Sequence, residues 1–516
     1  MSEHFLNPED WDKLLEAPLA ERPKKRLRDY RVPLSHQFLL MLWSTVVSLM
    51  SFVPLYISTS ADGLQSQIFY MAWGITQGQL PYVSIFSRSG LLYSALVAAT
   101  TFLGGLQWMM LIQLGCLYLS GIYLFKLVSY WTGDNRQALG LSGMFYAVNA
   151  VVGFGGFLSV QLAIPFVLIG LWLLVTYLND WRRDEIFITY GLVSALALAL
   201  EPRTLVFWLL SFVVFTGSNI AKKRWARGFY QQLAMVFGII LIIYPLAYIA
   251  VNLDLLTPYF EQAFIGNFSS LSDTGTMSFL PMGVNAILAL GLGLLTGLLF
   301  LPKVFRHMSE QTASVVLLAL LTLSYLIVAV LGQSWSFTDL LLLLPFGLLL
   351  TGLGLADEKT TLVNSRSARR QKLASSSVGL LKSHAYLPAV LLLVGLVWRL
   401  SPILTEQAVQ AEREQIAQYL SSEVTGETSI YAWDKSATIY LDSHLTSASQ
   451  IPIITAYPMT QTTQQQVVDE LLRGQASFVI VNKSLPLPEQ LQEKLDKDYQ
   501  HLSSPQFTHF NFYQKQ

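Results

Sequence analysis

The chain has 516 residues, of which 53% are hydrophobic and 13% are charged, and its mean hydropathy is +0.46. Because soluble domains carry about 25% charged residues, this composition excludes an ordinary soluble globular protein. Lysine plus arginine and aspartate plus glutamate both number 33, so the net charge gives no indication of nucleic-acid binding. The single cysteine, Cys116, lies in an apolar run, which excludes an intrachain disulfide and a cysteine-based metal site.

The first 35 residues are polar, and an apolar run follows over 36–57. A run of about 20 residues can cross a bilayer, whereas a cleaved signal peptide has a shorter core that starts earlier. The runs that the sequence predicts to cross are 36–57, 106–131, 138–154, 157–178, 186–200, 204–220, 229–251, 282–301, 311–331, 337–355 and 386–403. A twelfth run, 89–104, is short and rich in glycine.

Lysine and arginine concentrate in alternate connections, and basic loops stay on the cytoplasmic side of a membrane. The basic groups lie at 22–31, 182–183, 222–227, 303–306 and 359–382, whereas loops 252–281 and 332–338 contain no lysine or arginine. Every basic group falls on one side only if eleven runs cross. This predicts a cytoplasmic segment 1–35, a transmembrane domain 36–403 and an extracytoplasmic tail 404–516.

With eleven crossings, 89–104 does not cross, and we expect a juxtamembrane or re-entrant helix within a first outer loop, 58–105. Lys126 supports this, because it lies near the end of the 106–131 run, where a lysine can snorkel to the inner surface. The segment 357–385, rich in serine, lysine and arginine, is predicted to be a flexible cytoplasmic linker.

The tail has a different pattern, because its polarity rises after Thr405. Periodicity predicts helices over 406–421, 461–473 and 488–499, and strands over 429–433, 438–441, 477–481 and 507–513. A domain of about 110 residues can form its own core. The fold class is therefore an α-helical polytopic membrane protein of about eleven spans with a small C-terminal extracytoplasmic α/β domain.

Asp62 is the first candidate for chemistry, since it follows the first span by about five residues. A carboxylate near apolar surface has a raised pKa and can act as a general base. The alternative is an N-cap, because Asp before Gly-Leu-Gln-Ser is a good helix start.

Arg88 is the only basic residue in 58–105. A guanidinium binds phosphate oxygens through parallel hydrogen bonds, so Arg88 is a candidate for the phosphate of a lipid-linked substrate. The alternative is an interfacial arginine that snorkels.

Glu201 and Arg203 lie between two short spans on the predicted outer side. Arg203 is a candidate second phosphate contact, and Glu201 could orient it or bind a sugar hydroxyl. The alternative is a local ion pair in a tight turn. Loop 252–281 could cover such a site, or it could be an amphipathic interfacial helix. Aromatic residues of the first outer loop, among them Tyr82 and Tyr93, suit either sugar stacking or an interfacial belt.

No metalloprotease, phosphate-loop or CxxC motif occurs, and no acidic cluster has metal-ligand spacing. We therefore predict no cofactor, while a divalent metal stays open. Mid-span charges are nearly absent, which argues against an ion-coupled transporter.

These features together resemble the GT-C superfamily of membrane glycosyltransferases, in the branch of protein O-mannosyltransferases and the lipid A aminoarabinose transferase. The resemblance rests on Asp62, then Gly78-Gln79-Leu80-Pro81-Tyr82, then Arg88 before Leu91-Leu92-Tyr93, and on tail segments 429–433, 437–441 and 477–481. The chain departs from the family at Gly63, where a second acid is common, and at Ser89-Gly90, where two prolines are common. The second outer loop offers Ser159 and Gln161 where relatives carry another acid.

The resemblance implies inverting sugar transfer on the outer face of the cell membrane. The donor would be a sugar on a polyprenyl phosphate, and the acceptor a cell-envelope glycan, lipid or protein. Asp62 would accept the acceptor's proton, and Arg88 with Arg203 would hold the phosphate. Glu201, Tyr82, Tyr93 and Gln161 are candidate substrate contacts, and no metal is expected.

Two other classes stay open. A flippase or export component for envelope polymers would have a charged cavity within its spans, which this sequence largely lacks. A polysaccharide polymerase or ligase would carry a large outer loop between spans, whereas here the largest outer element is the tail.

Overall fold

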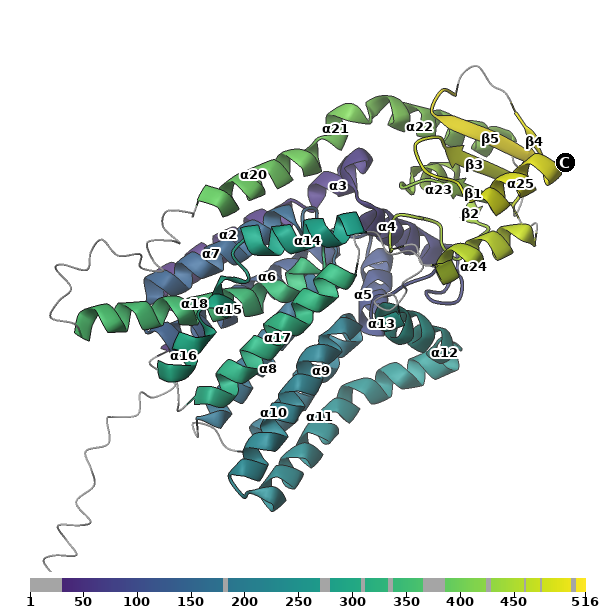
Figure 1. Ribbon diagram of the computed structural model, residues 1–516. Coiled ribbons are helices and arrows are strands. Elements are labelled where there is room, and N and C mark those ends of the chain that lie inside the picture. The colour runs from purple at the N-terminus through teal and green to yellow at the C-terminus, as the bar shows by residue number, and fades with distance from the viewer. Residues whose placement is uncertain are drawn as a thin grey trace, which may run out of the picture.

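The computed structural model describes residues 30–179, 184–269, 279–307, 311–332, 337–364, 386–423, 428–458, 461–473, 476–502 and 507–516. A bundle of helices carries a small α/β domain at one end, and the C-terminus lies in that domain (Figure 1). The basic residues predicted at 22–29 and 182–183, and most of the predicted linker, lie outside the described residues.

Each predicted crossing corresponds to helix in the structure. The helices are α2 (Leu34–Leu49) with α3 (Phe52–Tyr56), α6 (Gln107–Thr132), α7 (Asn135–Val151), α8 (Ser159–Leu178), α9 (Ile186–Leu200), α10 (Leu205–Ala221), α11 (Trp225–Asn252), α14 (Phe279–Gly291) with α15 (Thr296–Leu299), α17 (Thr312–Leu331), α18 (Leu340–Asn364) and α20 (Tyr386–Leu400). A short helix, α16 (Leu301–His307), follows α15.

Seven of the helical segments in the described residues are long and apolar enough to cross a membrane. They are Leu34–Tyr56, Gln107–Thr132, Ser159–Leu178, Pro202–Ala221, Trp225–Asn252, Thr312–Leu331 and Tyr386–Thr405, and shorter apolar helices accompany them. The chain is therefore a multi-pass membrane protein. The run 89–104 contains α5 (Leu91–Phe102), whose 12 residues extend about 18 Å, less than the ~30 Å hydrocarbon core.

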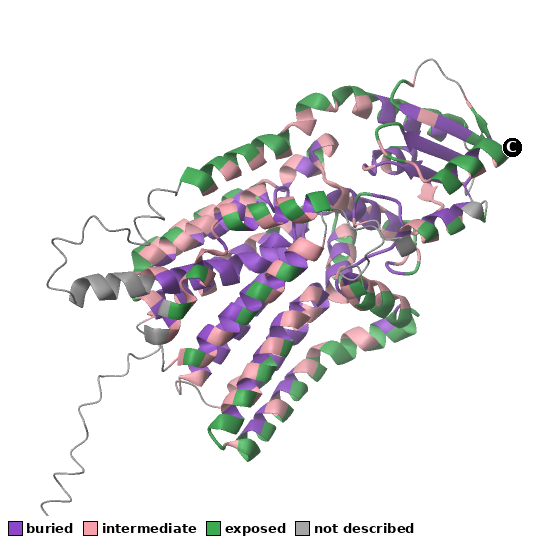
Figure 2. Ribbon diagram, viewed as in Figure 1, coloured by how far each residue is buried: buried purple, intermediate pink, exposed green. Residues whose placement is uncertain are grey.

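Burial separates the centre of the bundle from its surface. Helix α8 is apolar around its whole circumference and 83% of it is buried, as expected for a helix with neighbours on all sides. Helices α11 and α20 instead expose large apolar side chains (Figure 2). In a bilayer such faces contact lipid tails, so the exposed residues are compatible with a membrane location.

The α/β domain is a five-stranded sheet of order β2-β1-β3-β5-β4. Its strands are β1 (Ser429–Trp433), β2 (Thr446–Ser447), β3 (Phe478–Asn482), β4 (Tyr499–His501) and β5 (Phe510–Lys515). Strand β1 pairs in parallel with β2 and β3, whereas β5 pairs antiparallel with β3 and β4. In register, Ile430 lies opposite Phe478 and Trp433 opposite Val481.

Helices cover both faces of this sheet, because alternate strand residues point to opposite sides. Ile430, Ala432 and Ile480 pack with α22 (Gln407–Glu423) and α23 (Thr438–Ser443). Tyr431, Val479 and Val481 pack with α24 (Gln461–Leu472) and α25 (Glu489–Asp498). Both faces of the inner strands are thus buried, which explains their continuous apolar sequence.

The α/β domain shares its core with the first outer loop. Ile68 and Tyr70 of α4 (Gly63–Thr76) and Tyr93 of α5 belong to the same cluster as the α22 and α23 face. The Tyr70 and Tyr440 rings meet edge to face at 5.2 Å, and the backbone amide of Phe86 donates to the Gln450 carbonyl at 2.7 Å. The domain is therefore fixed on the residues that the sequence analysis selected for chemistry.

Two sequence predictions in these regions were wrong. Segment 438–441 forms α23 rather than a strand, because Thr438, Ile439, Tyr440 and Ser443 are all buried between α22 and α4, a helical and not an alternating pattern. The predicted linker starts too early, since α18 continues to Asn364.

Candidate functional site

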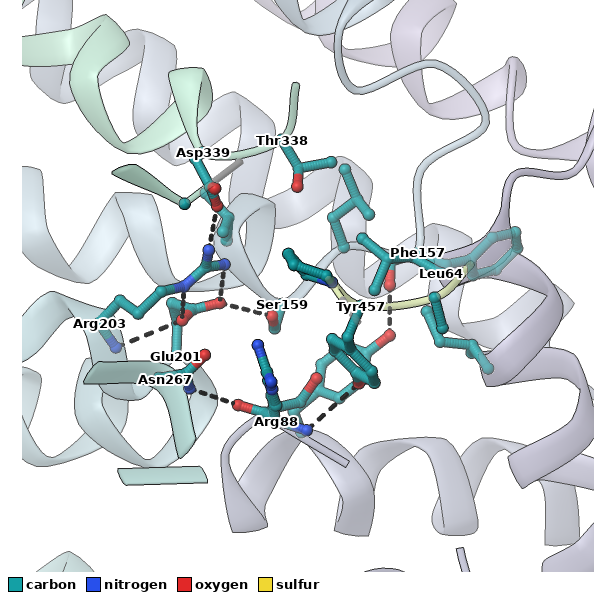
Figure 3. Close-up of a pocket in the computed structure, with 18 of the residues that line it drawn as sticks. Leu64, Arg88, Phe157, Ser159, Glu201, Arg203, Asn267, Thr338, Asp339 and Tyr457 are labelled. Atoms are coloured by element: carbon teal, nitrogen blue, oxygen red, sulfur yellow. Dashed lines mark hydrogen bonds and ion pairs between the residues drawn. The ribbon is translucent and has the colours of Figure 1, made fainter. Parts of the chain in front are cut away.

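Residues from seven parts of the chain converge on a cavity of about 80 Å³ where the helix bundle meets the α/β domain (Figure 3). We call this cavity the Arg88 pocket. Its lining is Leu64, Ile68, Arg88, Ser89, Tyr93, Phe157, Leu158, Ser159, Val160, Glu201, Arg203, Asn267, Val328, Gly332, Thr338, Asp339, Ala456, Tyr457 and Pro458.

A tight loop before α5 presents Arg88. Tyr82 has a left-handed backbone (φ 68°), and its buried hydroxyl donates to the Ser89 carbonyl at 3.0 Å and bonds Ser94 at 2.8 Å. The Gln262 side chain donates to the Tyr82 carbonyl at 2.7 Å. Tyr82 lies outside the pocket lining and holds the loop, so the structure gives its side chain a positioning role.

The backbone of Arg88 is fixed on both sides. Its amide donates to the Tyr457 hydroxyl at 3.2 Å, and Asn267 donates to its carbonyl at 2.8 Å. Asn267 belongs to α13 (Gly266–Ser269), which follows α12 (Leu256–Tyr259) and a π-helical segment, Phe260–Ile265. The described part of loop 252–281 is therefore helical and closes one side of the pocket.

The guanidinium of Arg88 has no anionic contact among the described residues. It lies against two rings, 5.4 Å from the Tyr457 centroid and 5.8 Å from Phe86, a geometry that favours a cation. The residue is only 7% exposed, and its Nε has no hydrogen-bond partner in the described structure. In Figure 3 the dashed lines at Arg88 end on its backbone atoms, and the guanidinium points into the pocket.

Burial lowers the pKa of Arg88 to about 10. The side chain is still protonated at neutral pH, so it is a buried cation that no carboxylate of the described residues contacts. Such a charge is costly unless an anion or several acceptors accompany it. The pocket is therefore suited to an anionic ligand.

Two carboxylates in the pocket are both engaged by Arg203, which lies in the 3₁₀ turn η3 (Pro202–Thr204). Its Nε donates to Glu201 at 2.7 Å and its Nη2 to Glu201 at 3.1 Å, and its Nη1 bonds Asp339. Ser159 donates to Glu201 at 2.7 Å. The predicted local pair of Glu201 and Arg203 exists, and Asp339 extends it to a three-residue network.

Two further residues were predicted to contact substrate, Tyr93 and Gln161, and only Tyr93 lines the pocket. Tyr93 lines the pocket, and its hydroxyl donates to the Phe157 carbonyl. Gln161 is fully buried outside the lining and donates to Asn149 and to the Gly153 carbonyl, both at 3.3 Å. Gln161 therefore fixes the glycine turn before α8.

Asp62 is the N-cap of α4 and lies outside the Arg88 pocket. Its Oδ1 accepts from the Gln65 amide at 2.9 Å, and Gln65 returns a bond to the Asp62 amide at 3.0 Å, which forms a capping box. Its Oδ2 accepts from Arg399 of α20 at 2.9 Å. The catalytic role of Asp62 stays a prediction, while its capping role is present.

Gly63, which follows Asp62, lies in close contact with Thr455 of the α/β domain. A Cβ at Gly63 would lie 2.5 Å from the Thr455 carbonyl carbon, so a side chain there would displace the α/β domain. Thr455 precedes Ala456 and Tyr457 of the pocket lining.

Sequence reasoning missed three residues of this region. Asp339 directly precedes α18 and follows a loop whose sequence has no lysine or arginine, so an acid at the end of a predicted span was a readable signal. Arg399 is the only charge in the last predicted span. Tyr457 lies in a segment without periodicity, and only the tertiary contact with Arg88 reveals it.

The architecture defines the class of fold. The chain is similar to the crystal structure of ArnT from Cupriavidus metallidurans bound to undecaprenyl phosphate, with a TM-score of 0.53 at 13% identity over 92% of this chain and 98% of that one. The apo structure of the same protein gives 0.51 at 13% identity, over 93% and 98%. The chain therefore has the same overall fold as ArnT.

Two family models cover almost the whole sequence. The model of the putative competence-induced protein Ccs4 N-terminal domain matches residues 25–406, and that of the Ccs4 C-terminal domain matches residues 410–516. The chain belongs to this family. No curated protein sequence matches it.

The ion network yields a stability prediction. Arg203→Ala leaves Glu201 and Asp339 as buried carboxylates without their partner, so we expect a loss of about 3–5 kcal/mol. The matched control is Arg227→Ala, whose pair with Asp184 is 43% and 46% exposed, and it should cost about 0–1 kcal/mol. Thermal unfolding of both purified variants measures the difference, and equal shifts would contradict a buried network.

Proposed function

We propose that the protein transfers a sugar from a polyprenyl-phosphate donor to a hydroxyl-bearing acceptor on the outer face of the membrane, with inversion. One observation carries this proposal: the buried Arg88 guanidinium points into a pocket without an anionic contact among the described residues. A phosphate group supplies the missing negative charge and accepts hydrogen bonds from the guanidinium fork.

The fold supports the choice of phosphate donor. The similar ArnT structure was determined with undecaprenyl phosphate bound, and at 13% identity this likeness speaks for the fold alone. The inference for this chain therefore depends on Arg88 and its surroundings. In this proposal the lipid headgroup enters the Arg88 pocket and its tail lies along the apolar helices.

In this proposal Arg88 is the main phosphate contact. Arg203 is a second contact through the two of its five N–H donors that the carboxylates do not occupy. Glu201 and Asp339 then keep Arg203 in place, and Glu201 or Tyr93 can accept or donate hydrogen bonds at the pocket wall.

The reaction requires a base on the acceptor side. The acceptor oxygen attacks the anomeric carbon, the bond from that carbon to the phosphate oxygen breaks, and Asp62 takes the hydroxyl proton. Arg88 stabilises the charge that develops on the departing lipid phosphate. The hydrogen bond from Arg399 orients the Asp62 carboxylate. No metal is needed for this step, so chelation with EDTA should leave the rate unchanged.

The orientation in the membrane is part of the proposal. Basic residues of the turn between α10 and α11, Lys222, Lys223 and Arg224, lie on the cytoplasmic side by charge. The α/β domain and the Arg88 pocket then lie on the outer side, and the N-terminus lies in the cytoplasm.

The donor assignment predicts a loss of lipid-phosphate binding in Arg88→Ala. Removing a charged hydrogen-bond donor costs about 1.5–3 kcal/mol, so the Kd for undecaprenyl phosphate should rise about 10- to 100-fold. Purified protein in nanodiscs, titrated with undecaprenyl phosphate, measures this change. Arg136→Ala removes an exposed arginine outside the pocket and serves as control, and an unchanged Kd in Arg88→Ala would refute the assignment.

The substitution Asp62→Asn distinguishes a general-base role of Asp62 from its role as a helix cap. Asparagine caps helices as well as aspartate does, so the fold should be retained, while loss of the base should slow transfer about 10²- to 10⁴-fold. Envelope glycans of a deletion strain, complemented with wild type or Asp62→Asn, provide the measurement. Full restoration by Asp62→Asn would show that Asp62 acts only as a cap.

A further inference from the structure

A second cavity, of about 370 Å³, lies between the helix bundle and the α/β domain. Three parts of the chain form its wall: residues 58–63, the end of α20 with α21 (Pro402–Thr405), and residues of the α/β domain around 435 and 455. We call it the interface cavity. Asp62 lines it, whereas Arg88 does not.

Hydroxyl groups dominate the wall of the interface cavity. Seven lining side chains are serine or threonine: Ser58, Thr59, Ser60, Ser401, Thr405, Ser436 and Thr455. No hydrogen bond is formed by the hydroxyls of Ser58, Thr59 and Thr455 within the part of the chain that the structure describes. These groups can both donate and accept, so they suit a ligand that carries hydroxyls of its own.

The charged groups of the cavity are compensated in pairs. Asp62 pairs with Arg399 at 2.9 Å, and Lys435 pairs with Glu406. The Arg413 guanidinium is engaged by the buried Asp434 at 2.6 Å. No net charge therefore selects for an anion or a cation, in contrast to the Arg88 pocket. Each pair still offers donors and acceptors to a neutral polar ligand.

An aromatic side chain completes the wall. Trp398 lines the cavity, is 50% exposed, and is supported by the Phe337 ring at 5.5 Å. An exposed indole beside hydroxyls and paired charges offers a flat apolar surface with polar groups at its edge. The apolar face of a sugar ring fits such a surface, and its hydroxyls reach the surrounding polar groups.

We infer that the interface cavity binds the acceptor of the proposed transfer, and that this acceptor is an uncharged saccharide. The inference rests on the proposed function. Asp62 faces the acceptor in this cavity and Arg88 faces the donor in the next one. The two cavities adjoin along the chain, because consecutive residues Gly63 and Leu64 line one cavity each, and so do Thr455 and Ala456. Gly63 also lies against Thr455.

The test measures saccharide binding without any donor. Full-length protein in nanodiscs is titrated with maltotriose, cellotriose, chitotriose and mannotriose, and with an uncharged Ser/Thr peptide. Thr59→Trp fills the interface cavity from its wall. Ile57→Trp places the same ring two residues earlier, at a position that is 42% exposed and outside both cavities, and is the matched control.

We expect wild type and Ile57→Trp to bind at least one of the four saccharides, and Thr59→Trp to bind it at least tenfold more weakly. Binding of the peptide alone, binding of no saccharide, or saccharide binding that Thr59→Trp leaves unchanged would overturn the inference. Undecaprenyl phosphate is titrated on the same samples. If wild type fails to bind undecaprenyl phosphate, the proposed function fails, and this outcome is distinct from the saccharide result.

Discussion

The burial of the Arg88 side chain is the constraint on which the contact between the helix bundle and the α/β domain depends. Arg88 is enclosed only because the α/β domain contributes Tyr457 to its surroundings and α13 contributes Asn267. The shared core of α4, α5, α22 and α23 holds these parts together. The guanidinium has no anionic contact among the described residues, and the two nearby carboxylates are bonded to Arg203. We propose that this arrangement binds an anion.

The packing of the α/β domain against the helix bundle forms two cavities with different chemistry. The Arg88 pocket carries an uncompensated guanidinium and suits a phosphate, whereas the larger interface cavity carries paired charges and hydroxyls and suits a neutral sugar. Gly63 allows Thr455 to lie between them, so the α/β domain contributes to both cavities at once. In this account the C-terminal domain is part of the active site and not an accessory module.

The sequence predicts most helices and strands of this structure, and there are physical reasons why it does not predict the rest. Apolar runs and basic loops predict the helices of the bundle, and alternation predicts most strands of the tail. The strand predicted at 438–441 failed because a short apolar run has no intrinsic preference for strand over helix, and packing between α22 and α4 decides it. Of the residues named from the sequence, Arg88, Glu201, Arg203 and Tyr93 line one pocket, whereas Asp62, Tyr82 and Gln161 lie outside it. Their roles in binding and catalysis stay predictions. The contacts Arg203–Asp339, Arg399–Asp62 and Arg88–Tyr457 join residues more than 100 positions apart, and a single sequence carries no signal for them.

The most direct test of this account is a structure of the full chain with undecaprenyl phosphate in a nanodisc. We predict density for the phosphate in the Arg88 pocket, with its oxygens within hydrogen-bond distance of the Arg88 guanidinium and the lipid tail leaving between helices. Phosphate density elsewhere, with the Arg88 guanidinium unchanged and unoccupied, would contradict the central claim.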